Sequence, residues 1–287
     1  MKKMLIADIL LIIVSLIALI FSSITDLRTK EVPDWLSHGL ISAALAIRLL
    51  HAVIFQEISY FIYGLLGFII MFIIGNIFYH TKQLGGGDAK LAMGLGAAFA
   101  TSPFYISTQI PFLLILFCYI MVIGAVYGLA WAIYLITKDF KNFKSEVKKL
   151  TKTRYMKVFK IIALIIAGVF LAIIFFVLSS PSSKILMAAI TIITLIYPYI
   201  FMAAKAIENI HFYRTIITEN LVEGDWIAEN VKKNNKIIIP KKTMITKKDL
   251  QKIKQNNIKQ VVIKDGIPFV PPFLIGTILA LIFGNPF

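Results

Sequence analysis

Two aspartates and a run of glycines are the residues of this sequence whose types could support catalysis. Asp26 closes the first long apolar stretch, and Asp88 follows Gly85, Gly86 and Gly87 at the start of a later one. A carboxylate at the edge of a membrane segment is costly unless it has a partner or a task. Two carboxylates held together can share one proton, because like charges a few ångströms apart resist simultaneous ionisation. Such a pair can activate water against an amide carbonyl without a metal or a covalent nucleophile.

Helix ends offer a way to set the two carboxylates apart. Asp88 faces the positive N-terminus of the helix that follows it, whereas Asp26 lies near the negative C-terminus of the first helix. We therefore expect Asp88 to ionise more readily and Asp26 to hold the proton. The structural alternative is a capped loop, since Asp is a favoured helix cap and glycine-rich turns commonly join helices.

The residues around the glycine loop have more ordinary interpretations as well. The three glycines leave the backbone open to close approach by another chain. Lys90 either orients Asp88 or extends its ammonium group to the membrane interface. Asp34 follows Pro33 and is expected to cap the second helix.

Other catalytic chemistries find no support in the sequence. The four histidines lack the HExxH spacing of a membrane metalloprotease, and no Gly-x-Ser-x-Gly is present. The single cysteine, Cys118, excludes a Cys-rich zinc module within this chain. We therefore expect no metal site and no cofactor.

The elements that must position these residues are membrane helices. Of 287 residues, 59% are hydrophobic and the mean hydropathy is +0.83, well above soluble proteins, in which roughly half of the residues are apolar. Eight apolar segments are present, of which the fourth and the eighth are short. The sequence predicts an all-α polytopic membrane protein with about six to eight transmembrane helices and a small cytoplasmic α+β region before the last. The eight segments are 4–25, 36–55, 58–79, 89–102, 108–136, 158–179, 185–204 and 271–285.

These segments predict a division of the chain into five parts. They are a catalytic transmembrane core over 1–136, a basic cytoplasmic loop over 137–157, two transmembrane helices over 158–204, the cytoplasmic α+β region over 205–268 and a last transmembrane helix over 269–287. Within the α+β region, 236–239 and 258–263 are typical of strands, and Thr246 is expected to cap a short helix ending at Gln255.

The positive charge of the chain indicates its orientation in the membrane. The net charge is +15, but the basic residues concentrate in loops, so nucleic acid is not expected as a partner. All but four of the 30 Lys and Arg residues fall on one side of the eight-helix arrangement. The excess of positive charge predicts that this side is cytoplasmic, that both termini are outside, and that Asp26 and Asp88 share the cytoplasmic side.

The segments that contain the two aspartates resemble a known family. Ile24-Thr25-Asp26-Leu27-Arg28 and Gly85-Gly86-Gly87-Asp88-Ala89-Lys90-Leu91 resemble the type IV prepilin peptidases, and more closely their archaeal prepilin and preflagellin peptidase branch. These are GxGD aspartyl proteases of the membrane. The tail Gly266-Ile267-Pro268-Phe269-Val270-Pro271-Pro272 is similar to the Pro-Phe-x-Pro segment that opens the last helix of the family.

The resemblance implies both a reaction and a site. The reaction would remove a short basic leader from prepilin-like or preflagellin precursors at the cytoplasmic face of the cell membrane. Asp26 and Asp88 would be the catalytic pair, Gly85, Gly86 and Gly87 would admit the substrate backbone, and Lys90 would orient Asp88. The paired Cys-x-x-Cys motifs of many bacterial members are absent, so we expect cleavage without methylation of the new N-terminus. The implied partners are the precursors and the lipid bilayer, while no oligomeric state follows from the sequence.

A transporter that moves protons or cations through the two aspartates is the alternative from another class. Such a protein is expected to place interrupted helices at corresponding positions of two halves, near the middle of the membrane. Here both aspartates lie at one interface, which favours the peptidase.

Overall fold

The computed structural model describes residues 2–81, 83–106, 109–233, 236–241, 243–264 and 266–284. Its contacts divide the chain into two compact units. Unit 1 comprises Met1–Leu129 and Gly266–Phe287, and unit 2 comprises Ala130–Asp265.

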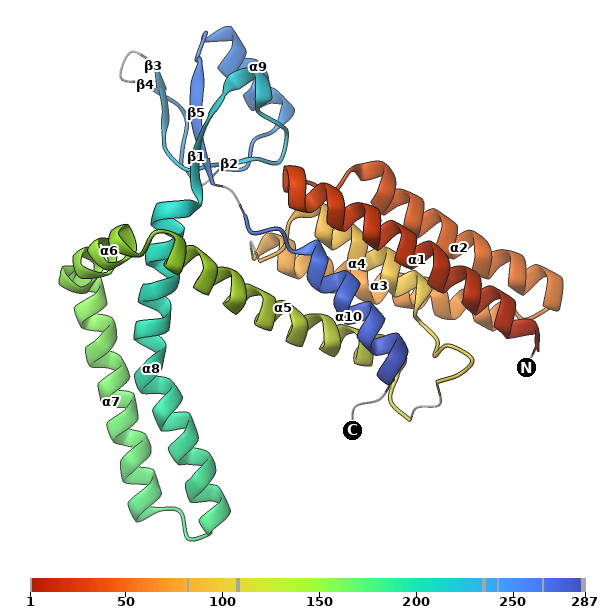
Figure 1. The fold of residues 1–287 in the computed structure, drawn as a ribbon, viewed down its shortest axis with the longest axis horizontal. Coiled ribbons are helices and arrows are strands. Elements are labelled where there is room, and N and C mark those ends of the chain that lie inside the picture. Colours follow the sequence, from red (N-terminus) through yellow and green to blue (C-terminus); the bar gives the residue numbers. More distant parts are fainter. Residues whose placement is uncertain are drawn as a thin grey trace. The chain divides into compact units, whose positions relative to one another are not determined.

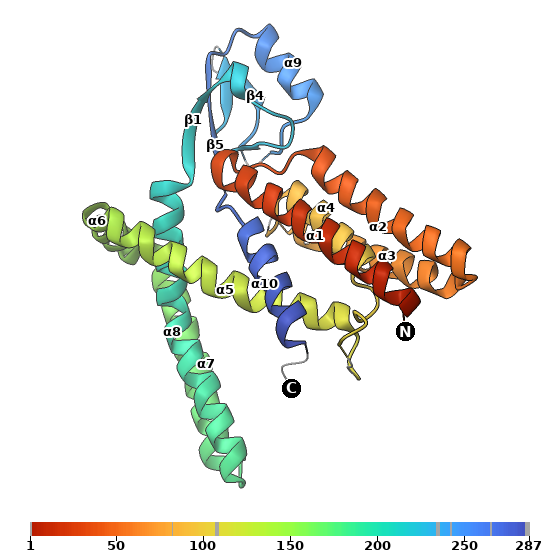
Figure 2. The same cartoon turned by 45° about the vertical axis from the view of Figure 1, so that its right-hand side comes forward.

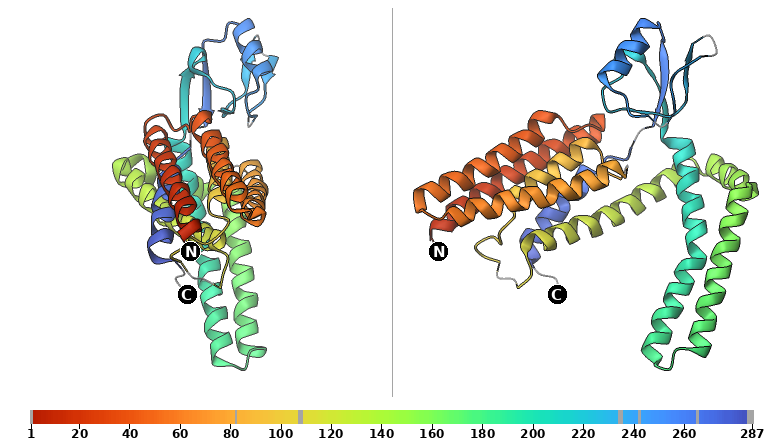
Figure 3. Two further views of the ribbon diagram at one scale, coloured as in Figure 1. Left: turned by 90° about the vertical axis from the view of Figure 1, so that its right-hand side faces the viewer. Right: turned by 180° about the vertical axis from the view of Figure 1, so that it is seen from behind.

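The helices of unit 1 carry both aspartates. In chain order they are α1 (Lys2–Thr29), α2 (Asp34–Phe55), α3 (Ile58–His80), α4 (Gly86–Ala98), the first part of α5 (Phe112–Lys138) and α10 (Val270–Phe283). α1, α2 and α3 lie side by side (Figures 1 and 3). Among the described residues, six helices are long and apolar enough to cross a membrane, namely α1, α2, α3, α5, α7 and α8. The predicted all-α polytopic architecture is confirmed, while α4 and α10 are shorter than a bilayer requires.

The short helix α4 is the most enclosed element of unit 1. It packs against α2, α3 and, less extensively, α1, and every residue from Leu91 to Ala98 is buried. Its close approach to α3 depends on glycine, because a Cβ atom on Gly96 would lie 2.4 Å from the carbonyl oxygen of Gly67. Small residues at a helix interface allow two backbones to meet in this way. The surrounding helices thus hold the helix that begins at the glycine loop.

Substitution of Gly96 by Ala is expected to destabilise unit 1 by about 1 to 3 kcal/mol, the usual cost of overpacking a core. The added methyl group meets backbone atoms of α3, which cannot rotate out of its way. The thermal unfolding of the purified protein measures the effect. Gly128→Ala in α5 is the matched control, because a Cβ there meets nothing within 4 Å and alanine favours a helix over glycine. Equal stability of the two variants would contradict the packing argument.

The last helix returns to unit 1 and packs against α1. Gly276 of α10 lies so close to α5 that a Cβ there would be 2.9 Å from the backbone of Ile120. The observed helix ends at Phe283, two residues before the predicted end at 285, and residues 285–287 lie outside the described part of the chain.

Unit 2 contains a helical hairpin and a small α+β region. α6 (Phe140–Lys152) precedes α7 (Arg154–Phe176) and α8 (Pro181–His211), which run antiparallel as a pair (Figure 2). The segment 137–157, expected as a basic loop, therefore consists largely of helix. Phe143, Val147 and Leu150 of α6 share a face and pack against Met202 of α8 and its neighbours. This apolar face explains why a lysine-rich segment folds as a helix.

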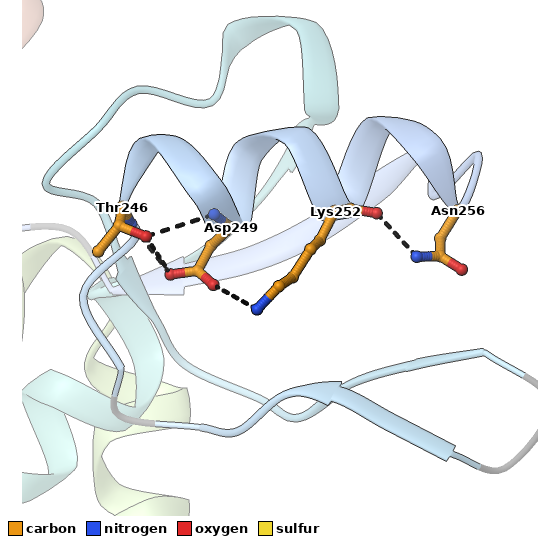
Figure 4. A network of polar contacts seen from close by, with 4 residues as sticks. All are labelled: Thr246, Asp249, Lys252 and Asn256. Atoms are coloured by element: carbon orange, nitrogen blue, oxygen red, sulfur yellow. Dashed lines mark hydrogen bonds and ion pairs between the residues drawn. The ribbon is translucent and has the colours of Figure 1, made fainter.

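The α+β region follows the short-range signals of its sequence. Its elements are β1 (Tyr213–Ile217), a 3₁₀ turn (Thr218–Asn220), β2 (Trp226–Ile227), β3 (Val231–Lys233), β4 (Lys236–Ile239), α9 (Lys247–Gln255) and β5 (Gln260–Lys264). The antiparallel sheet has the order β1-β5-β2, and β3 pairs with β4. The predicted cap is present, since Thr246 Oγ1 accepts the Asp249 N–H at 3.3 Å and Asp249 accepts the Thr246 N–H at 3.2 Å (Figure 4). The predicted strands near 236–239 and 258–263 and the predicted helix are confirmed.

Candidate active site

Asp26 lies in the last two turns of α1 and is 4% exposed. Its Oδ2 atom accepts a hydrogen bond of 2.8 Å from the backbone N–H of Val270. Val270 begins α10, and the next two residues, Pro271 and Pro272, have no N–H to donate. Asp26 therefore binds one of the few free donors in the first turn of α10. A carboxylate is stabilised at such a helix N-terminus.

The start of α10 is fixed by its packing against α5. The ring of Phe269 fills the space beside Gly124, where a Cβ atom would lie 2.6 Å from the ring. The same ring meets Phe273 edge-on, with centroids 6.1 Å apart. Val270 is fully buried. The N–H that binds Asp26 thus belongs to a closely packed turn.

Asp88 lies in the first turn of α4, where the glycine loop enters the helix. Its Oδ2 atom accepts the N–H of Gly85 at 3.2 Å. Gly87 packs against the loop between α1 and α2, because a Cβ there would be 2.7 Å from Cβ of Val32. Gly87 therefore has a structural reason to be glycine. The proposed opening of the loop toward substrate remains a prediction for Gly85 and Gly86, which are exposed.

The two carboxylates lie at the same end of unit 1 and influence each other. Burial, and after it repulsion by the Asp26 carboxylate, raises the pKa of Asp88 from its ordinary value of 3.8 to about 7, against the hydrogen bond from Gly85. Asp88 stands outside the six helices long enough to span a membrane. The N-terminus of α4 was expected to favour ionisation of Asp88, but desolvation outweighs it. Near neutral pH, the pair can hold one proton and one negative charge.

Lys90 has a different partner from the one expected. Its Nζ atom lies 2.5 Å from Oδ1 of Asp34, and the Asp34 side chain is 72% exposed. Asp34 is the first residue of α2 and makes no side-chain cap there, so its predicted role as a cap is wrong. This ion pair joins the start of α2 to the first turns of α4. The orientation of Asp88 by Lys90 stays a prediction, since the structure pairs Lys90 with Asp34 instead.

Two neighbours of Asp26 were not predicted from the sequence. The first is the N–H of Val270, for which Pro271 and Pro272 were a signal, because consecutive prolines mark a helix start. The second is Tyr127 of α5, which lies within electrostatic range of Asp26 and had no signal in the sequence. Among the residues that the structure describes, no three His, Cys, Asp or Glu side chains gather in a group that could hold a metal ion, so we assign no metal ligands.

Comparisons with known proteins point to one family. The sequence model of the type IV leader peptidase family matches residues 13–142, a segment that includes Asp26 and Asp88. A preflagellin peptidase of Methanocaldococcus jannaschii is 36% identical over 85 residues, which are 30% of this chain and 36% of that protein. One from Methanococcus voltae is 26% identical over 152 residues, 50% of this chain and 62% of that protein. The chain thus spans between about one third and just under two thirds of the length of these relatives.

Proposed function

We infer that this protein is a membrane aspartyl endopeptidase with Asp26 and Asp88 as its catalytic pair. The match of residues 13–142 to the type IV leader peptidase family supports this proposal. The observation that most supports this proposal is the placement of two carboxylates, from α1 and α4, at one end of unit 1. One of them has a pKa near neutrality because of burial and the other charge. Perturbed acids in such a pair are typical of catalytic sites.

The pair supplies both proton transfers that hydrolysis of a peptide bond needs. The ionised carboxylate takes a proton from water as the oxygen attacks the carbonyl carbon, and the protonated one donates to the carbonyl oxygen. The resulting tetrahedral diol breaks its C–N bond, and a proton returns to the leaving amine. Because the two acids titrate as a unit, we assign the shared proton to the pair rather than to one residue.

The proposed substrates are prepilin-like or preflagellin precursors, cut between the basic leader and the hydrophobic helix at the cytoplasmic membrane face. The names of the relatives support the substrate class. The excess of Lys and Arg on one side supports the face in the arrangement of eight crossings, which counts the short helices α4 and α10 as crossings. Cleavage is proposed to proceed without N-methylation.

Purified protein incubated with a prepilin-like and a flagellin-like precursor tests the proposal. Mass spectrometry of the products is expected to show loss of the leader from at least one precursor, with no added methyl group when a methyl donor is present. The protein reconstituted in vesicles tests the transporter alternative. Ion movement across those vesicles without cleavage of either precursor would overturn the peptidase proposal.

Replacement of Lys90 by Gln is expected to change the cleavage rate by less than about threefold. Its partner Asp34 is largely exposed, and exposed ion pairs contribute about 0 to 1 kcal/mol. Initial rates for Lys90→Gln and the parent measure the difference. A loss comparable to that of a catalytic aspartate would show instead that Lys90 acts on Asp88 directly.

A further inference from the structure

A second group of buried polar residues lies far along α1 from Asp26. Asp8 is 18 residues before Asp26, roughly 27 Å away at the 1.5 Å rise of a helix. Asp8 is 4% exposed. Its Oδ1 atom accepts the hydroxyl of Tyr60 at 2.7 Å, and its Oδ2 atom accepts the N–H of Phe104 at 2.9 Å. These bonds join α1 to α3 and to the segment that follows α4.

Arg48 of α2 completes this group and is fully buried. Its Nη1 atom donates to the carbonyl of Tyr60 at 2.9 Å, and its Nη2 atom donates to the carbonyl of Ala98 and to Oγ1 of Thr101, both at 3.0 Å. The guanidinium carbon also lies 4.4 Å from the centroid of the Tyr60 ring. Ala98 is the last residue of α4, and its carbonyl has no partner within the helix. Arg48 therefore caps the C-terminus of α4, where a positive charge is favourable.

The space for Arg48 is built into α3. A Cβ atom on Gly64 would lie 2.2 Å from Cδ of Arg48, so any larger residue there displaces the side chain. A buried arginine or aspartate is strongly unfavourable unless its charge and hydrogen bonds are compensated. Most of the polar atoms of Arg48 and Asp8 have partners, which makes this group a specific junction of four helices.

The junction touches the two helices that carry the catalytic pair, each near its other end. α1 begins near Asp8 and carries Asp26 near its C-terminus; α4 begins at the loop that carries Asp88 and ends at the carbonyl bound by Arg48. A helix transmits an axial shift along its length, since its backbone hydrogen bonds fix the rise per residue. An axial shift of α1 relative to α4 at the junction therefore also shifts Asp26 relative to Asp88.

We propose that Asp8, Arg48 and Tyr60 form a distal clamp of positioning residues that holds Asp26 and Asp88 at their working separation. The expected effect of the clamp on catalysis rests on the proposed peptidase function. Its expected effect on the separation of Asp26 and Asp88 does not. Loss of the clamp is expected to lower kcat, because a misplacement of about 1 Å can cost about 100-fold in rate. KM is expected to remain close to the parent value, because the clamp lies far from the two carboxylates.

Tyr60→Phe and Arg48→Met test the clamp, and Tyr63→Phe is the matched control. Tyr63 lies on the same helix and is 52% exposed, so removal of its hydroxyl leaves the clamp intact. We expect kcat to fall about 10-fold for Tyr60→Phe and up to about 100-fold for Arg48→Met, with KM within about twofold and no change for Tyr63→Phe. If Arg48→Met does not fold, Tyr60→Phe decides alone, since it removes a single oxygen atom.

A distance measurement tests the positional part without relying on catalysis. Spin labels at Leu27→Cys and Gln83→Cys, both exposed positions, in a Cys118→Ser background, report the separation between the end of α1 and the loop that enters α4. Tyr60→Phe is expected to broaden or shift the distance distribution, and Tyr63→Phe to leave it unchanged. An unchanged distribution, or an unchanged kcat in an active parent, would overturn the clamp. If the parent cleaves neither precursor, the peptidase proposal fails and the spin-label result decides the clamp by itself.

Discussion

Asp88→Asn is expected to lower the rate of precursor cleavage by about 10²- to 10⁴-fold, the range attributable to a general acid or base. The amide occupies the same space but can neither accept the proton of water nor hold one for the carbonyl oxygen. Asp26→Asn is expected to lower the cleavage rate by a similar factor, because the two acids act as a unit. For the same reason the double variant should lose hardly more than either single variant. Initial rates under saturating precursor measure all three.

Asp34→Asn is the matched control for both substitutions. It removes a third carboxylate near the same end of unit 1, but one that is exposed and paired with Lys90. Its cleavage rate should stay within about threefold of the parent, since exposed ion pairs contribute little. Unfolding midpoints of all variants establish that they are folded. Parental cleavage by folded Asp26→Asn or Asp88→Asn would remove that residue from the catalytic pair.

The fold was predictable wherever the signal was local. Apolar runs about as long as a bilayer requires predicted the six long helices, and the expected cap at Thr246 predicted α9. α4 was harder to delimit because glycine tolerates many conformations, so its first turn was assigned to the loop. α6 was not predicted because its many lysines are typical of a loop, although Phe143, Val147 and Leu150 have helical spacing.

The two candidate acids could be recognised in the sequence, but their contacts could not. Asp26 and Asp88 stand out because acids at membrane edges are rare. The N–H that binds Asp26 comes from Val270, 244 residues later in the sequence, and such a contact follows from how α10 packs against α1 and α5. The pairing of Lys90 with Asp34 likewise depends on how α2 lies beside α4. No spacing in the sequence distinguishes that partner from Asp88.

The stability of the protein is expected to depend on pH through Asp88. The carboxyl has a pKa of about 7 in the folded state and 3.8 as its ordinary value, so the folded protein binds this proton more tightly than the unfolded chain. This proton therefore stabilises the folded protein. Its contribution to the free energy of unfolding is complete below about pH 4 and is lost progressively as the pH rises to about 7. Asp88→Asn should abolish this contribution to the unfolding midpoint.

The rate of cleavage is expected to fall about tenfold per pH unit above pH 7, as for the loss of one essential proton. Burial is the larger cause of the raised pKa of Asp88, and the Asp26 charge is the second. Below pH 7 the pair keeps one proton for the carbonyl oxygen; above it, both carboxylates are ionised and the general acid is missing. A rate profile from pH 5 to 9 measures the fall, and a constant rate from pH 7 to 9 would contradict it.

Asp26→Asn separates the two causes of the raised pKa. The amide removes the neighbouring charge but leaves the half-buried Asp88 carboxyl desolvated, so the pKa of Asp88 should decrease without returning to 3.8. In this variant the pH-dependent loss of stability should therefore end at a lower pH than in the parent. Unfolding midpoints between pH 4 and 8 measure the shift in a protein that need not be active. An identical pH dependence in the parent and in Asp26→Asn would show that the two carboxylates are too far apart to share a proton, and the catalytic pair would then be excluded.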